Sequence, residues 1–404
     1  MEMTILTIIY SLLSCVLIFF LVLPFFNVLL SRFIREKKPL AAKREIDFAN
    51  IITAYKNVDI AKGLVRSLLN QKHRNHRIYL VADNCDISNW DIEHEKLTVL
   101  RPEEGLNLKA KSIIHGIENF TREHEYCVVF DADNLAHPKF LETINNYAVA
   151  GNRSIQGQRT AKNHNTLYAC ADATGEFYKN YIERYVPHLI GSSSVISGSG
   201  MAVETELYKA YLASPEIEQG KRLGKKMLQE DKILQNFLLR LNEKIVYAWD
   251  AVVFDEKVTT GDDVETQRTR WLYSYFQNIP NSLDILHRGI TNFSWNQWLY
   301  GLITITPPMF IMLFGAIALA GLGLFLQPMM TVAFVAAIGI FALTIFWTLY
   351  LSKVPKEIWS AIWGMPLFVF KQFTALFKMS NPNENFKHTE HKILISMDEI
   401  LERE

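Results

Sequence analysis

The sequence predicts an α/β domain with a mostly parallel sheet, joined to transmembrane and interfacial helices. Short apolar runs alternate with amphipathic patterns in the middle of the chain, and long uncharged apolar stretches lie near both ends. The 404 residues, 49% of them hydrophobic, are enough for a sizeable core and more than one structural unit. The formal net charge is zero, so nothing in the composition suggests nucleic acid as a partner.

The N-terminal stretch has no charged residue from Thr4 to Leu30, which is long enough to cross a bilayer at roughly 20 residues per span. It is too long for the apolar core of a signal peptide, and no small-residue cleavage site follows it. We therefore expect residues 1–36 to form an N-terminal transmembrane helix and residues 37–262 to form the domain that follows.

Two more uncharged stretches run from Trp298 to about Leu326 and from about Met330 to Leu351, and residues 297–353 are predicted to hold two transmembrane helices. Basic residues follow the first and third stretches, which places these flanks and the domain between them in the cytoplasm. These basic residues are Arg32, Arg35, Lys37, Lys38, Lys353 and Lys356. The four scattered cysteines, which have no disulfide or metal spacing, agree with this location.

Residues 354–380 are rich in aromatic side chains but also carry Lys371 and Lys378, so we expect an interfacial amphipathic helix, with a fourth span as the alternative. Residues 381–404 are predicted to form a cytoplasmic tail. Its His388 and His391 have an H-x-x-H spacing, but no third ligand lies near, so a dedicated zinc site is not expected.

Alternating strand and helix patterns in residues 37–262 favour a parallel sheet with helices on both faces. In open sheets of this kind, ligands bind at the carboxyl ends of the strands. The expected strands are residues 48–53, 77–82, 97–100, 126–130 and 154–158, and the expected helices are residues 60–69, 108–120 and 138–148.

Asp131 and Asp133 directly follow one of these strands and so lie at the predicted ligand-binding edge. Two carboxylates one residue apart can offer oxygen ligands to a hard divalent cation, which in turn can bind a diphosphate. A solvated turn, or an N-cap for the helix near Pro138, is the alternative.

Other strand ends place polar groups at the same edge. Thr53, Ala54 and Tyr55 end the first strand, and Asp83 ends the second. Lys109, in the segment EGLNLKAK, could bring positive charge to a phosphate, and an ordinary solvated helix face is the alternative.

Five motifs, in their order and rough spacing, resemble those of membrane-bound family 2 glycosyltransferases such as the synthases of cellulose, hyaluronan and poly-N-acetylglucosamine. The motifs are IITAYKN, VADNCD, VVFDADN, LQED at residues 228–231 and QRTRW at residues 267–271. D-x-D or E-D alone is a weak signal, but the ordered set just before membrane spans is specific. The resemblance implies a GT-A-type nucleotide-sugar-binding domain.

The resemblance also implies roles for individual acids. Asp83 matches an acid that binds the donor nucleotide, and Asp131 lies near the nucleotide and the metal. Asp133 matches the ligand of an Mg²⁺ or Mn²⁺ ion that bridges the diphosphate. Asp231, preceded by Glu230, matches the catalytic base, which takes a proton from the acceptor hydroxyl. Gln229 stands where the family usually has Thr, which puts the local contacts in doubt.

Gln267, Arg270 and Trp271 match the Q-x-x-R-W motif, and their spacing puts them on one side of a helix. Arg can pair with phosphate oxygens, and Trp offers a flat apolar face to a sugar. A membrane-interface belt is the simpler explanation of this aromatic stretch, and both can hold for residues 263–296, which we expect to form interfacial amphipathic helices. The Gly- and Ser-rich residues 191–203 resemble the segment lining the acceptor path, and QGQRT at 156–160 resembles a strand beside the donor.

The expected function is therefore that of an inner-membrane, multi-pass, metal-dependent inverting glycosyltransferase. It would use a nucleotide sugar, most plausibly a UDP-sugar, and Q-x-x-R-W favours a processive polysaccharide synthase that extends a glycan. Addition of one sugar to a lipid-linked acceptor is the alternative, and a silent glycan-binding subunit is a third hypothesis. Three spans are few for a secretion channel, so a homo-oligomer or an accessory secretion subunit is an expected partner beside the membrane lipids.

Overall fold

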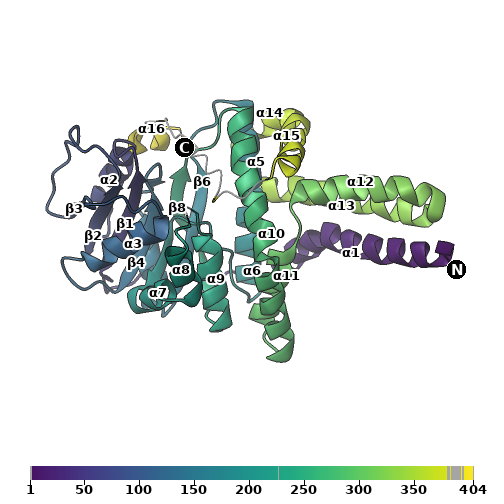
Figure 1. Cartoon of the computed structure of the whole chain (residues 1–404), viewed down its shortest axis with the longest axis horizontal. Helices are drawn as coiled ribbons and strands as arrows, with labels where there is room; N and C mark the ends of the chain where they lie inside the picture. Colours follow the sequence, from purple (N-terminus) through teal and green to yellow (C-terminus); the bar gives the residue numbers. More distant parts are fainter. Residues whose placement is uncertain (1, 226, 380–382, 384–392, 394, 404) are drawn as a thin grey trace.

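A computed structural model describes residues 2–225, 227–379, 383, 393 and 395–403. An α/β domain and a bundle of long helices lie on opposite sides of the long helix α10 (Gly261–Thr291), as Figure 1 shows. The tail histidines His388 and His391 lie outside the described residues.

One mixed sheet forms the centre of the α/β domain, with strand order β3-β2-β1-β4-β7-β6-β8-β5. The pairings make β1, β2, β3, β4, β6 and β8 run in one direction, whereas β7 and β5 run in the opposite direction. The carboxyl ends of six strands therefore meet at one edge. The strands are β1 (Phe48–Tyr55), β2 (His76–Asp83), β3 (Leu97–Leu100), β4 (Tyr126–Asp131), β5 (Leu135–Ala136), β6 (Ser154–Ala161), β7 (Met201–Glu204) and β8 (Ile245–Asp255).

Helices cover both faces of this sheet, which explains why β1, β2 and β4 are mostly apolar along their whole length. In β4, Val128 packs into one core with α2 (Ala61–Leu69) and α4 (Phe140–Val149). Its neighbour Val129 points to the other face, into a core shared with α3, α7, α8, α9 and α11. These helices are α3 (Lys109–Glu118), α7 (Thr205–Leu212), α8 (Pro215–Arg222), α9 (Glu230–Arg240) and α11 (Trp295–Ile305).

Three helices among the described residues are long and apolar enough to cross a membrane, namely residues Ile5–Ser31, Met309–Leu326 and Pro328–Leu351. They belong to α1 (Glu2–Ser31), α12 and α13, and each packs against the other two. Leu21, Met312 and Phe341 belong to the apolar core between them. These helices indicate a membrane protein.

The second apolar stretch differs from the prediction, because its helix does not begin at Trp298. A break at Thr306–Pro308 divides it into α11, which packs on α10, and α12, which begins at Met309. Two consecutive prolines explain the break, since proline lacks an N–H and clashes with the preceding turn inside a helix.

Residues 354–379 form two short helices joined by a 3₁₀ turn rather than one long helix. α14 (Lys356–Ala361) packs on α5 (Leu167–Lys179), and α15 (Met365–Phe377) packs on α10. Among the described residues, this part of the chain holds no helix long enough for the alternative fourth span. The short helix α16 (Met397–Leu401) packs on Leu135 and Phe254 at the far edge of the sheet.

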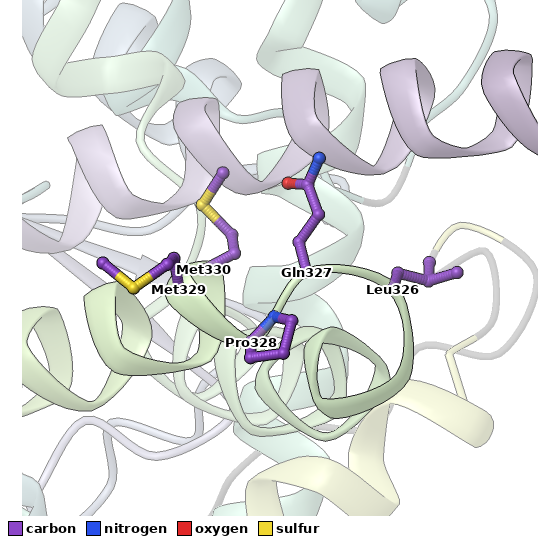
Figure 2. Close-up of a pocket in the computed structure, with 5 residues that line it drawn as sticks. All are labelled: Leu326, Gln327, Pro328, Met329 and Met330. Atoms are coloured by element: carbon purple, nitrogen blue, oxygen red, sulfur yellow. The ribbon is translucent and has the colours of Figure 1, made fainter.

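The turn between α12 and α13 closes the outer end of the bundle around a hollow of about 440 Å³. Figure 2 shows its lining residues, with the Gln327 side chain directed at α1. The Gln327 amide oxygen accepts a hydrogen bond of 3.2 Å from the Ser11 hydroxyl. This hollow lies at the end of the bundle remote from the α/β domain, so it belongs to helix packing and not to the site at the sheet edge.

Candidate functional site

The two acids of the D-x-D lie at the carboxyl edge of the sheet. Asp131 ends β4 opposite Thr53 of β1, and its side chain is about one-third exposed. Asp133 is nearly buried, and its carboxylate lies 3.4 Å from the backbone N of Glu256 and 3.5 Å from the amide of Asn134. The Asp131 carboxylate is therefore open to a ligand, and that of Asp133 is held in place beside it.

Lys109 joins this edge to two other parts of the site. Its ammonium lies 2.5 Å from Oδ1 of Asp131 and donates a hydrogen bond of 3.0 Å to the carbonyl of Gly198. Burial opposes the charge of Lys109, but the Asp131 carboxylate outweighs it and raises the pKa of the lysine. Glu230 and Asp231 act on it in the same direction. Lys109, which sequence alone could not separate from a solvated helix face, is thus a central cation of the site.

Glu230 and Asp231 begin α9 and face the same cluster. Burial is the main cause that raises the pKa of the Glu230 carboxyl to about 7, although the Ala110 amide and Lys109 act against it. A Cβ built at Gly198 would lie 3.9 Å from Cβ of Asp231, so the carboxylate-bearing helix approaches the glycine closely. The E-D motif and the D-x-D motif, about one hundred residues apart in the chain, therefore share one site through Lys109.

The Gly- and Ser-rich segment is held by the QGQRT strand. The side-chain amide of Gln156 is buried. It donates a hydrogen bond of 3.1 Å to the carbonyl of Ser199 and accepts one of 2.9 Å from the backbone N of Ser197. Gly198 and Gly200 have φ values of +87° and +62°, a backbone region that residues other than glycine rarely adopt. These two sequence stretches form one unit that carries the Gly198 carbonyl to Lys109.

Asp83 at the end of β2 is 2% exposed and anchors a loop. Its two carboxylate oxygens accept hydrogen bonds of 2.8 Å from the backbone N atoms of Leu106 and Asn107. The Asn107 side chain in turn accepts one of 3.1 Å from the hydroxyl of Tyr55, at the end of β1. Ala54, beside it, is buried in the core at 1% exposure. Asp83 therefore fixes the loop that leads into Lys109.

The QRTRW motif lies in α10, where Trp271 is flanked by cations. The guanidinium carbon of Arg268 lies 4.3 Å and the ammonium of Lys179 lies 5.0 Å from its ring centroid. Arg268 also forms an ion pair with the buried Asp172 of α5. Burial lowers the pKa of Arg270, and the buried Oε1 of Gln267 has no hydrogen-bond partner among the described residues. Sequence analysis did not single out Arg268, although it lies within the motif.

A buried ionic network connects α5 to the strands of the site, and it was not predicted. Glu176 lies 3.0 Å from Arg159 of β6, 2.8 Å from Arg184 and 3.4 Å from Lys257. Burial alone would raise the pKa of Glu176, but the three cations hold it well below its usual range. Lys257 also forms an ion pair of 3.1 Å with Asp255. Asp255 in turn accepts a hydrogen bond of 3.2 Å from the side chain of Asn134, the residue after the D-x-D.

The donor set at the D-x-D fits a divalent cation that is shared with a bound ligand. Among the described residues, no group of three or more His, Cys, Asp and Glu side chains could hold a metal alone. Asp131 and Asp133 offer only carboxylate oxygens, which hard cations such as Mg²⁺ and Mn²⁺ prefer. Lys109 now supplies positive charge at Asp131, the position that a cation would take.

Comparison with solved structures finds the same fold. The structure of the mannosyltransferase PcManGT from Pyrobaculum calidifontis in complex with GDP-Man and Mn²⁺ is similar with a TM-score of 0.52 at 12% identity, over 94% of this chain and 100% of that chain. A crystal structure of S. aureus TarS 1-349 has a TM-score of 0.41 at 12% identity, over 86% of this chain and 94% of that chain. At these identities, the likeness concerns the fold alone.

Among curated protein sequences, none matches this chain. A family profile described as "Glycosyltransferase like family 2" matches residues 46–274, which is more than half of the chain and includes every motif from the first strand to QRTRW. The chain therefore belongs to the family 2 glycosyltransferases, and its α/β domain has the GT-A fold.

Proposed function

We propose that the protein is a membrane-bound, metal-dependent inverting glycosyltransferase whose active site faces the cytoplasm at the inner membrane. The observation that carries this proposal is the single cluster in which Lys109 joins Asp131 of the D-x-D to Gly198 and, through its charge, to Glu230 and Asp231. A transferase needs both a site for a leaving diphosphate and a base for the acceptor, and this cluster provides candidates for both.

The donor is taken to be a nucleotide sugar, most plausibly a UDP-sugar. The similar structure from Pyrobaculum calidifontis holds GDP-Man with Mn²⁺. It supports a nucleoside diphosphate sugar as donor and a bound metal ion, but it identifies neither the nucleobase of this protein's donor nor its metal. When bound at Asp131 and Asp133, Mg²⁺ or Mn²⁺ would neutralise charge on the diphosphate as it leaves. Thr53, Ala54 and Tyr55 at the end of β1, with the loop that Asp83 anchors, border the place assigned to the nucleotide.

Asp231 is proposed as the base. The acceptor hydroxyl oxygen attacks the anomeric carbon, its proton passes to the Asp231 carboxylate, and the bond from that carbon to the diphosphate oxygen breaks with its electron pair on the leaving group. One direct displacement inverts the anomeric carbon. Burial raises the pKa of Glu230 to about 7, so this carboxyl would add less negative charge beside the base than a usual carboxylate.

The acceptor is proposed to stay at the membrane surface as a lipid-linked molecule. Apolar side chains fill the interior of the α1, α12 and α13 bundle, which favours an acceptor that approaches from the side over one threaded through a single chain. Processive elongation of a polysaccharide is the second candidate, favoured by QRTRW. A second copy or an accessory subunit would then have to complete the export path.

The first experiment measures nucleoside diphosphate release by the detergent-solubilised full chain from a panel of UDP- and GDP-sugars with Mg²⁺ or Mn²⁺. Release from one donor, absent in Asp231→Asn, is the expected result. Asp133→Ala should abolish the metal-dependent part of nucleotide binding, and unchanged binding would remove Asp133 as a ligand. Product length, measured by mass spectrometry, separates single addition from elongation.

A further inference from the structure

The helix α5 carries a stripe of charged residues on a side that faces the protein interior. Asp172, Glu176 and Lys179 are spaced four and three residues apart, so they share one helix face. Asp172 and Glu176 are 5% and 6% exposed, which is unusual for charged side chains unless they are paired. The stripe lies between the strands of the GT-A domain and α10, and each member contacts a different part of the site.

Two members of the stripe have ion-pair partners. Asp172 pairs with Arg268 of the QRTRW motif, and Glu176 pairs with Arg159, Arg184 and Lys257. These ion pairs explain why Asp172 and Glu176 are charged although they are buried, without any need for a bound ligand.

Lys179 is the exception within the part of the chain that the structure describes. It forms no ion pair there, and its ammonium instead lies 5.0 Å from the centroid of the Trp271 ring. Burial lowers its pKa, with Arg268 and Arg184 acting in the same direction and the carboxylates of Glu183 and Glu176 against it. A partly buried ammonium without an ion-pair partner is costly, and an arriving anion would offset that cost.

The position of Lys179 indicates where such an anion comes from. The preceding residue, Tyr178, packs on Phe341 of the membrane helix α13, with ring centroids 6.3 Å apart. The residue after Trp271, Leu272, belongs to an apolar cluster with Phe310 of α12. The Lys179–Trp271 pair thus lies at the junction between the GT-A domain and the membrane helices.

We propose that Lys179, together with the ring of Trp271, forms a binding site for the phosphate group that joins the acceptor to its lipid. The proposal rests on the proposed function and names the acceptor class as a phosphate-linked lipid. An ammonium has three donors for phosphate oxygens, and the indole supplies an apolar surface for the adjoining chain or sugar. The phosphate of an anionic phospholipid headgroup has the same chemistry, so the test must separate the two sources.

The test measures binding of geranylgeranyl phosphate to the full-length protein in neutral phosphatidylcholine nanodiscs, with geranylgeraniol as the uncharged probe. Lys179→Gln should weaken binding of the phosphate about 10- to 100-fold, the usual effect of losing a charged hydrogen bond. Lys179→Arg should restore most of the affinity, and geranylgeraniol should not distinguish the variants. Lys209→Gln, which removes an exposed lysine paired at 2.8 Å with Glu206, is the matched control and should bind like wild type.

Equal affinity of Lys179→Gln and wild type for geranylgeranyl phosphate would overturn the site. If dioleoyl phosphatidylglycerol bound as tightly as geranylgeranyl phosphate, and its binding also depended on Lys179, the site would be a phospholipid headgroup site. That result would overturn the proposal that it binds the acceptor. Nucleotide binding, measured in parallel, should be the same in all variants. If no nucleotide sugar is turned over while Lys179 still binds the isoprenyl phosphate, the proposed function fails but the phosphate site stands.

Discussion

The guanidinium of Arg159 and the carboxylate of Glu176 form an ion pair of 3.0 Å, although their side chains are only 14% and 6% exposed. Arg159 lies on β6 and also donates 3.0 Å to the carbonyl of Ser197, next to Gly198. Glu176 lies on α5, which also carries Lys179 and, through Asp172, contacts Arg268. One buried pair therefore links the edge of the sheet to the helices beside the membrane.

Glu176→Gln should destabilise the protein strongly, because it leaves three buried cations around a neutral amide. Breaking one partner of a buried ion pair typically costs about 3–5 kcal/mol. Thermal unfolding in detergent would measure the loss. Glu206→Gln removes a carboxylate from an exposed pair and should cost under about 1 kcal/mol, so a similar effect of the two changes would contradict the network.

Asp231→Asn should abolish sugar transfer and leave nucleotide binding close to wild type. The amide keeps the shape of the side chain but cannot take the acceptor proton at neutral pH. Product formation and nucleotide affinity, measured on the same preparation, test both halves of this expectation. Turnover near the wild-type rate would remove Asp231 as the base.

Gly198→Ala should reduce activity much more than it reduces stability. At a φ of +87°, an alanine is strained by about 1–2 kcal/mol, and any shift of the Gly198 carbonyl disturbs Lys109 and the nearby Asp231. Gly151→Ala is the control, since Gly151 has a φ of +90° with nothing within 4 Å of the added Cβ. Similar unfolding temperatures with activity lost only in Gly198→Ala would support the assignment, and equal activity in both variants would argue against it.

The raised pKa of Glu230 should make the free energy of unfolding depend on pH. Its folded pKa of about 7 lies above the ordinary value of 4.5, so the folded state binds this proton more tightly than the unfolded state. The resulting stability is fully present below about pH 4.5 and is lost as the pH rises through 7. Relative to wild type, Glu230→Gln should therefore gain of the order of 2 kcal/mol between pH 5 and pH 8. Urea unfolding at both pH values would measure this, and parallel pH profiles would show that Glu230 does not titrate in that range.

The sequence predicted the parallel half of the sheet well, because buried parallel strands are uninterrupted apolar runs with helices between them. β1, β2 and β4 begin and end within two residues of the expected positions, and β3 matches at both ends. β7 was missed because only four residues follow the glycines of ISGSG, and its antiparallel pairing with β4 and β6 depends on distant segments. β8 was missed although IVYAWDAVVFD is rich in β-branched and aromatic residues, a signal that was available.

In the site, the motif acids were predictable and the buried cations were not. Asp131, Asp133 and Asp231 stand in recognisable spacings. Lys257, by contrast, is a single basic residue that resembles a solvated surface in sequence, and nothing in QGQRT indicates that Arg159 is buried in an ion pair. Only the fold brings them to Glu176. The spacing of Asp172, Glu176 and Lys179 within an otherwise apolar, alanine-rich helix was the one local signal of an interior polar face.

The proline break before Met309 leaves the membrane helices unequal in length. At 1.5 Å per residue, the 18 residues of α12 extend about 27 Å, whereas the 24 residues of α13 extend about 36 Å. A hydrocarbon layer of about 30 Å is thicker than α12 alone can cover, and such mismatch is relieved by local thinning of the bilayer. Because Phe310, near the start of α12, packs against Leu272 of α10, the thinned part of the bilayer would lie beside Trp271. A lipid headgroup would there have the shortest distance to move from the bilayer surface to the enzyme.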